Sequence, residues 1–159
     1  MGRAIDRANP HLHGRYRPWR AYGQAKLANF HFGLGLQREL EHAGASTASL
    51  IAHPGLSNTD LQAVSVQQTG GGTSQRFFLF LARRSGMSAA DGALSQLRAA
   101  TDPAAEGGEF YGPRFVNSGP PVRKPVVRRL GMDKAIAALW EVSERETGIA
   151  IDVRAAAAA

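Results

Sequence analysis

The 159-residue sequence contains no cysteine, which excludes disulfide bonds and thiolate metal sites and is compatible with a reducing cytoplasm. No apolar run approaches the roughly 18 residues that a membrane-spanning helix requires. The N-terminus carries Arg3, Asp6 and Arg7 and has no apolar centre of an export signal. We therefore predict a cytoplasmic protein with no membrane partner.

Acidic residues are scarce relative to basic ones, with 13 Asp and Glu against 19 Lys and Arg, which gives a net charge of +6. Arg15, Arg17 and Arg20 alternate with Tyr16 and Trp19, a pattern that could contact phosphates and stack on bases. However, the arginines are spread over several predicted elements, and no nucleic-acid-binding module is recognisable. We interpret them as solvated surfaces and predict no nucleic-acid partner.

Potential metal ligands are also few. His11 and His13 lie two residues apart in a loop, but no neighbouring carboxylate or cysteine completes a ligand set, so we predict no metal site. His53 follows a predicted strand, at the edge where active-site groups gather in open α/β sheets. For His53 we favour a structural hydrogen bond over proton transfer, and the second role stays open.

Tyr22 and Lys26 are the most informative residues present. They lie four positions apart in a predicted helix over residues 20–40, so both side chains project from one helical face. A positive charge close to a phenol favours its phenolate form, which makes the tyrosine a better proton donor and acceptor at neutral pH. The same spacing of tyrosine and lysine also occurs by chance on many helices. The surrounding sequence therefore decides whether the pair is interpreted as catalytic.

That context is a segment over residues 46–52 with the pattern of a buried strand, followed by the loop His53-Pro54-Gly55. The order of helix, strand and Pro-Gly loop resembles the short-chain dehydrogenase/reductase family. The run Tyr22-Gly23-Gln24-Ala25-Lys26-Leu27-Ala28-Asn29 is most similar to the retinol-dehydrogenase-like subgroup, although Ala25 replaces a serine common there. Shorter similarities follow in order over residues 90–93, 99–103, 107–113 and 139–144.

The resemblance implies an NAD(P)(H)-dependent oxidoreductase that interconverts an alcohol and a carbonyl, with a small-molecule alcohol, aldehyde or ketone as substrate. Tyr22 would give a proton to the carbonyl oxygen, and Lys26 would assist it while contacting the nicotinamide ribose. The same two residues and the loop residues would bind the cofactor, with NADP favoured over NAD; the loop residues are Pro54, Gly55, Leu56, Ser57 and Thr59.

The predicted fold class is α/β, the C-terminal part of a Rossmann-type doubly wound parallel sheet whose N-terminal nucleotide-binding half is missing. That family begins with a glycine-rich turn that holds the cofactor pyrophosphate. The glycine cluster at residues 70–72 follows the Tyr22 helix and lacks the later glycines of that turn. The family's carbonyl-polarising serine is not found in residues 1–9. We therefore expect a truncated chain.

We predict one partial domain over residues 1–159, with an N-terminal loop at 1–15, the dehydrogenase-like part at 16–148 and a tail at 149–159. Further helices are expected over residues 74–84, 88–100 and 133–146, with a short strand at 110–111 and a long connection at 113–130. Two strands alone would expose a sheet edge, so we expect either marginal stability of the isolated chain or self-association through that edge. The alternative hypothesis is a non-catalytic relative that acts as an interaction module or is inactive.

Overall fold

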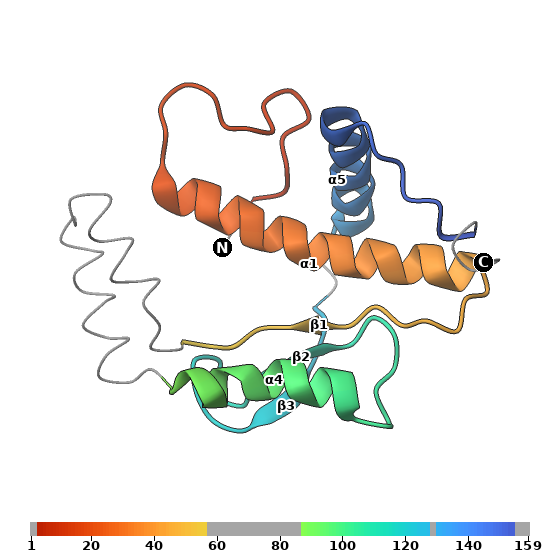
Figure 1. The fold of residues 1–159 in the computed structure, drawn as a ribbon. Coiled ribbons are helices and arrows are strands. Elements are labelled where there is room, and N and C mark those ends of the chain that lie inside the picture. Colours follow the sequence, from red (N-terminus) through yellow and green to blue (C-terminus); the bar gives the residue numbers. More distant parts are fainter. Residues whose placement is uncertain (1–2, 57–86, 128–129, 155–159) are drawn as a thin grey trace. The chain divides into compact units, whose positions relative to one another are not determined.

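The computed structural model describes residues 3–56, 87–127 and 130–154, in which the chain forms three helices and three strands (Figure 1). In chain order they are α1 (Pro18–His42), β1 (Ile51–Ala52), α4 (Ala89–Thr101), β2 (Phe110–Pro113), β3 (Pro121–Lys124) and α5 (Met132–Thr147). The chain divides into two compact units. The helical unit comprises Met1–Leu50, Glu106–Gly108 and Val126–Ala159, and the sheet unit comprises Ile51–Ala105 and Glu109–Pro125.

Helix α1 has clear start and stop signals. Pro18 occupies its first turn, where the missing N–H costs no helical hydrogen bond. At the other end Gly44 adopts a left-handed conformation with φ of 66°. The Gly44 N–H donates to the Glu41 carbonyl at 3.1 Å and the Ala45 N–H to the Leu40 carbonyl at 3.0 Å, which completes a Schellman ending. Among the described residues, α1 and the other helices lack the combined length and apolarity to cross a bilayer.

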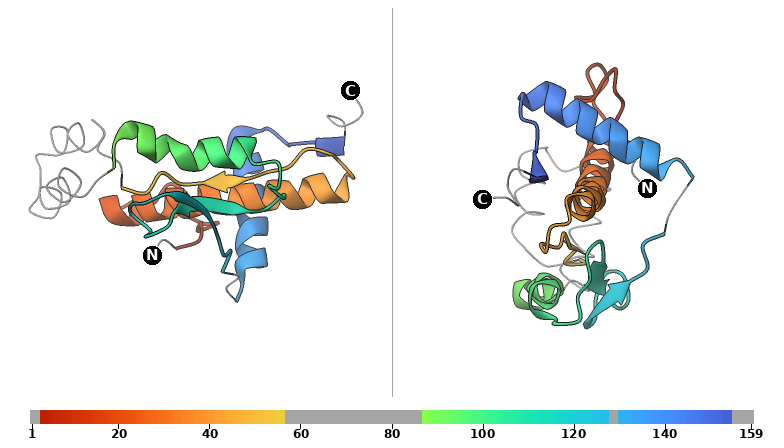
Figure 2. Two further views of the ribbon diagram at one scale, coloured as in Figure 1. Left: turned by 90° about the horizontal axis from the view of Figure 1, so that it is seen from below. Right: turned by 90° about the vertical axis from the view of Figure 1, so that its right-hand side faces the viewer.

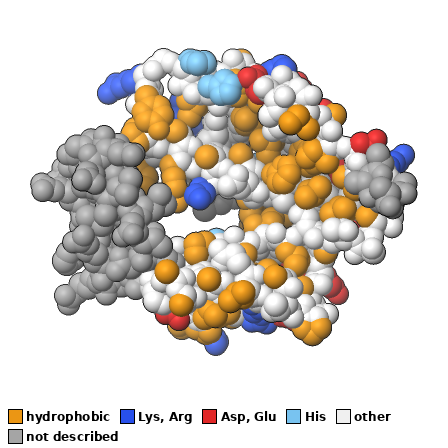
Figure 3. Space-filling view, viewed as in Figure 1, with side chains coloured by type: hydrophobic (Ala, Val, Ile, Leu, Met, Phe, Trp, Pro, Cys, Tyr) orange, Lys and Arg blue, Asp and Glu red, His pale blue; other side chains and the backbone are white. Residues whose placement is uncertain are grey.

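Helix α5 runs across α1 within the helical unit, as Figures 1 and 2 show. Its buried residues Ile136, Leu139 and Val142 repeat at helical spacing, and α1 contributes buried Leu34. Gly35 lets the two helices approach closely, because a Cβ atom there would lie 2.1 Å from Nε1 of Trp140. Hydrophobic side chains gather on this face over α1 and α5 (Figure 3).

The segment before α1 contains no helix or strand over its described residues. Polar contacts hold it within the helical unit. Gln24 of α1 donates to the Pro10 carbonyl at 2.9 Å, and Arg7 pairs with Glu141 of α5 at 2.8 Å. His11 Nε2 lies 2.8 Å from Glu146 Oε2, and this hydrogen bond is the main cause of the lowered pKa of the Glu146 carboxyl.

The sheet unit is built on three strands in the order β1-β2-β3. β1 pairs with β2 in parallel, with Ile51 opposite Phe110, whereas β2 pairs with β3 antiparallel, with Phe110 opposite Lys124. Helix α4 packs on these strands (Figure 2) through its buried small residues Gly92, Ser95 and Ala99. The predicted start of α4 is confirmed, because the Ser88 hydroxyl caps it by accepting from the Asp91 N–H at 3.0 Å.

The sequence expectations were wrong for part of the sheet. The strand expected over residues 46–52 has only two residues, Ile51–Ala52, and the connection expected over 113–130 contains β3. The sheet is therefore mixed, not purely parallel, because a short reversal after β2 returns the chain antiparallel, closed by a 2.9 Å bond from Arg114 N–H to the Pro120 carbonyl. The helix expected over residues 74–84 lies outside the described residues.

Candidate functional site

Tyr22 and Lys26 lie together on the exposed face of α1. The Lys26 Nζ atom is 5.5 Å from the centroid of the Tyr22 ring, and the tyrosine is 56% exposed. In the described part of the chain no carboxylate pairs with the Lys26 ammonium. The shared face that the spacing predicts is present, and the phenol and ammonium remain open to a ligand. Their catalytic role stays a prediction.

Packing on the other side of α1 explains this exposure. His31 is buried and lies two and a half helical turns after Tyr22, on the opposite side of the helix. Gln24, only two residues from Tyr22, is also buried and is fixed by its bond to the Pro10 carbonyl. Over this first part of α1 the buried side therefore lies opposite the Tyr22–Lys26 pair, which leaves the pair exposed.

The Pro-Gly loop belongs to the sheet unit and begins where β1 ends. The His53 N–H donates to the Tyr111 carbonyl at 3.0 Å, which extends the pairing with β2 by one residue. Gly55 adopts φ of 72°, a conformation that favours glycine, and its N–H donates to Nδ1 of His53 at 3.0 Å. The Leu56 N–H donates to the Asn117 carbonyl at 2.9 Å. The turn is thus fixed by a side chain of the loop and by a carbonyl from another segment of the sheet unit.

His53 has a structural hydrogen bond, the role favoured from sequence. Its ring stacks on Phe110 with centroids 5.4 Å apart and lies against Gly112, where a Cβ atom would come within 2.5 Å of the imidazole. Burial lowers the pKa of His53, and the nearby Lys124 ammonium lowers it further. The ring is therefore held neutral with Nδ1 as an acceptor, which preserves the bond from Gly55.

The predicted site residues are divided between the two units. Tyr22 and Lys26 are brought together in the helical unit, and Pro54, Gly55 and Leu56 in the sheet unit. Both backbone polar groups of Leu56 are already engaged, since its carbonyl also accepts from the Met87 N–H at 2.9 Å. Ser57 and Thr59 lie outside the described residues. The cofactor contacts assigned to the loop stay predictions.

A polar cluster in the sheet unit was not anticipated from sequence. Tyr111, only 1% exposed, donates from its hydroxyl to Glu109 at 2.6 Å, and Arg123 pairs with the same carboxylate. This hydrogen bond is the main cause that raises the pKa of Tyr111 to about 12, with burial next. Arg98, Tyr111 and Arg123 line a cavity of about 240 Å³. Glu109 directly precedes β2 and lies two residues from Tyr111, and this spacing was the signal that the sequence offered.

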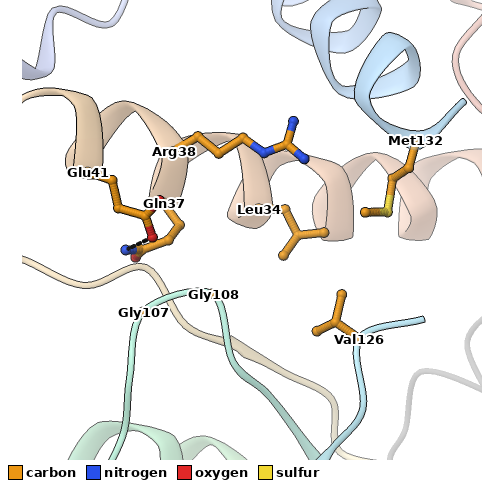
Figure 4. A pocket seen from close by; sticks show the side chains of 8 residues that line it. All are labelled: Leu34, Gln37, Arg38, Glu41, Gly107, Gly108, Val126 and Met132. Atoms are coloured by element: carbon orange, nitrogen blue, oxygen red, sulfur yellow. Dashed lines mark hydrogen bonds between the residues drawn. The ribbon is translucent and has the colours of Figure 1, made fainter. Parts of the chain in front are cut away.

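The helical unit contains a small cavity of about 140 Å³ beside α1 (Figure 4). Leu34, Val126 and Met132 form its apolar part, and Gln37 and Glu41 face one another across one helical turn with a 3.0 Å hydrogen bond. Gln37 also accepts from the Ser49 N–H at 2.8 Å, and Arg38 pairs with Asp133. The polar groups that line the cavity are therefore already paired with one another or with neighbouring residues.

Among the described residues no cluster of three or more His, Asp or Glu side chains is arranged to hold a metal ion. His11 and His13 approach each other with ring centroids 5.7 Å apart, and His11 is already paired with Glu146. The carboxylate that sequence reasoning did not find near these histidines therefore comes from α5, far along the chain.

Comparison with known proteins gives two similarities, and no protein-family model matches the chain. The chain is 46% identical to mouse (Mus musculus) polyprenol dehydrogenase over 59 residues, which are 36% of this chain and 17% of that enzyme. A crystal structure of an uncharacterized protein from Mycobacterium paratuberculosis matches with a TM-score of 0.64 and 33% identity, over 96% of this chain and 47% of that protein. The chain thus spans about half the length of the solved relative. The observed α/β architecture is compatible with part of a Rossmann-type fold.

Proposed function

We propose that this chain carries the proton-transfer part of a nicotinamide-dependent oxidoreductase of the short-chain dehydrogenase/reductase type. The observation that carries the proposal is the exposed Tyr22–Lys26 pair, with the Lys26 Nζ atom 5.5 Å from the centroid of the phenol ring. The partial identity to a polyprenol dehydrogenase and the likeness to a solved protein about twice as long support it. The retinol-dehydrogenase-like subgroup is part of the same proposal.

The chemistry follows from the two side chains. When bound, the nicotinamide cofactor would supply the hydride in the reducing direction or accept it in the oxidising one. Tyr22 gives a proton to the carbonyl oxygen as the alcohol forms and takes it back in reverse. Lys26 stabilises the phenolate that proton donation leaves behind. Because its ammonium has no carboxylate partner in the described residues, it fits the ribose hydroxyls of the cofactor.

The Pro-Gly loop would hold the nicotinamide end of the cofactor, through Pro54, Gly55 and Leu56 together with Ser57 and Thr59. The loop fits a role in which backbone geometry matters, because Gly55 is held by His53 and Leu56 by Asn117. We propose NADP as the favoured cofactor and NAD as the alternative. The substrate is an alcohol, aldehyde or ketone, and the matched relative suggests a long apolar alcohol.

Calorimetric titration of the folded chain with NADPH and then NADH is the first experiment, followed by turnover assays with apolar alcohols and aldehydes. Replacing Tyr22 by Phe should reduce turnover about 10²–10⁴-fold, because the proton donor is lost while the ring is retained. Tyr16→Phe is the matched control, since Tyr16 is also exposed in the helical unit but has no assigned role. Turnover that survives Tyr22→Phe would overturn the assignment.

The second candidate is a non-catalytic interaction module. It is favoured by the position of β1 at the edge of the sheet, which offers a backbone edge to another strand. We propose self-association through this edge, and light scattering behind size-exclusion chromatography tests it. An Ala52→Pro variant should shift a dimer toward monomer. A concentration-independent monomer, together with cofactor binding in the titration, would exclude this candidate.

A further inference from the structure

Three side chains line one face at the start of α1. Trp19, Tyr22 and Lys26 are spaced by three and then four residues, so they follow one another along the same face of the helix. The Trp19 and Tyr22 rings meet edge to face, with centroids 6.3 Å apart and an interplanar angle of 82°. The Lys26 Nζ atom lies 5.5 Å from the centroid of the same phenol ring. The phenol ring therefore has both an indole and an ammonium as neighbours.

We propose that Trp19 is a positioning residue for Tyr22, whose indole keeps the phenol ring beside Lys26. The expected effect of Trp19 on turnover rests on the proposed function. Its expected effect on the position of the Tyr22 ring does not. It adds a residue outside the Tyr-x-x-x-Lys pattern to the site. Trp19 acts through Tyr22 and takes no part in the proton transfer.

The exposure of Tyr22 makes such a device necessary. At 56% exposure the ring has no surrounding core to select its rotamer, and an unrestrained surface tyrosine samples several. An edge-to-face contact is directional, because the positive edge of one ring meets the negative face of the other. The ammonium also prefers the face of the phenol ring. Together these contacts favour one rotamer, in which Tyr22 and Lys26 are neighbours.

Loss of the Trp19 indole should change the rotamer population of Tyr22 and not the chemistry of the proton transfer. Without the indole, the phenol spends less time next to Lys26, so turnover falls in proportion while substrate affinity changes little. From the usual strength of an aromatic pair, the loss in kcat is about three- to tenfold. Phenylalanine at position 19 retains an aromatic edge and should restore most of this loss, whereas leucine retains only bulk.

The structural test needs neither cofactor nor substrate. Nuclear Overhauser effects on the folded 159-residue chain report whether the Tyr22 ring protons lie near the Trp19 indole and the Lys26 Cε protons. We expect both cross-peaks in the wild type, loss of the Tyr22–Lys26 cross-peak in Trp19→Leu, and its return in Trp19→Phe. Tyr16→Leu, which removes a neighbouring exposed aromatic ring, should leave it unchanged.

Several outcomes overturn the proposal. An unchanged Tyr22–Lys26 cross-peak in Trp19→Leu would do so, as would failure of Trp19→Phe to restore it. If Trp19→Leu does not fold, absence of the Trp19–Tyr22 cross-peak in the wild type would be equally decisive. If the cross-peaks behave as expected but no turnover is found, the positioning role stands and the dehydrogenase function fails. Where turnover is found, an unchanged kcat in Trp19→Leu would remove its catalytic consequence.

Discussion

In the helical unit the candidate functional groups are side chains on an exposed helical face, whereas in the sheet unit they belong to a loop whose backbone N–H groups are held by hydrogen bonds. Tyr22 and Lys26 project to solvent, and the buried residues behind them set their direction. Gly55 and Leu56 are instead held by hydrogen bonds to His53 and Asn117. The first arrangement presents the chemical groups of side chains at the surface. The second arrangement presents a defined backbone conformation, which requires a rigid turn.

The two units consequently differ in which substitutions they tolerate. On the exposed face of α1, a change alters a chemical group but leaves the packing intact. In the Pro-Gly turn, a change alters the backbone and the elements packed around it. Glycines allow a direct comparison of the two units, because each unit contains a glycine against which another group packs closely. These are Gly35 beneath the Trp140 ring and Gly55 against the Asn117 backbone.

The largest effect on stability is expected for Gly55→Ala. Its φ of 72° strains any residue with a Cβ atom, and that atom would lie 2.7 Å from the Asn117 carbonyl oxygen and 2.7 Å from Pro113 Cγ. Strain and overpacking together should lower the free energy of unfolding by about 2–4 kcal/mol. Chemical denaturation measures the loss, and hydrogen exchange of β2 amides locates it in the sheet unit.

Gly44→Ala is the matched control for this prediction. Gly44 has a similar φ of 66° but no atom within 4 Å of the position that a Cβ would occupy. It should therefore show the conformational strain alone, about 1–2 kcal/mol. If both variants lose the same stability, the Pro-Gly turn is not rigidly packed, and the contrast between the two units is wrong.

A smaller loss is expected for Gly35→Ala in the helical unit. Here the backbone is helical, so alanine brings a gain of about 0.8–1.0 kcal/mol in helix propensity. The added methyl group would nevertheless lie 2.1 Å from Trp140 Nε1 and 3.0 Å from Ile136 Cγ2. We expect the cost of overpacking to exceed the gain in helix propensity, so the free energy of unfolding should fall by about 1–2 kcal/mol in a denaturation experiment.

Trp140→Phe provides the second half of a double-mutant cycle at this contact. The phenyl ring is shorter than the indole and removes Nε1, so Gly35→Ala should cost less in the Trp140→Phe background. A Gly35→Ala variant that is more stable than the wild type would mean that helix propensity decides here, and that α5 adjusts freely on α1.

The smallest effect is a loss of stability on acidification that both units share. Burial lowers the pKa of His31 in the helical unit, and burial and then Lys124 lower the pKa of His53 in the sheet unit, from an ordinary value of 6.5. Each histidine therefore gains its proton more readily in the unfolded chain. The free energy of unfolding should fall as the pH drops below about 6.5, and the contribution of the two histidines should level off once the pH is below their folded pKa values.

Substitutions separate the two contributions to this pH dependence. His53→Asn retains a side-chain acceptor for the Gly55 N–H but does not titrate, and His31→Gln removes the titrating group from α1. Denaturation curves at about pH 7.5 and about pH 5.5 should differ less in each variant than in the wild type. An identical pH dependence in all three proteins would show that other groups cause it.

Local signals in the sequence determined the helices. Pro18 and Gly44 delimit α1, Ser88 with Asp91 starts α4, and Gly148, with φ of 69°, ends α5. The spacing of Tyr22 and Lys26 likewise placed both on one face, because helical geometry is fixed by the backbone alone. These features depend on residues a few positions apart, so a single sequence is sufficient to predict them.

Tertiary structure alone decided the sheet, the burial of the histidines and the direction of the exposed face. β3 lies in a Pro-rich segment with little strand signal and forms because β2 offers a partner for it. His53 is fixed by Gly55, Phe110 and Gly112, and His11 meets Glu146 across most of the chain. Strand pairing and burial join residues that are distant in sequence, so their energies exist only once the chain has folded.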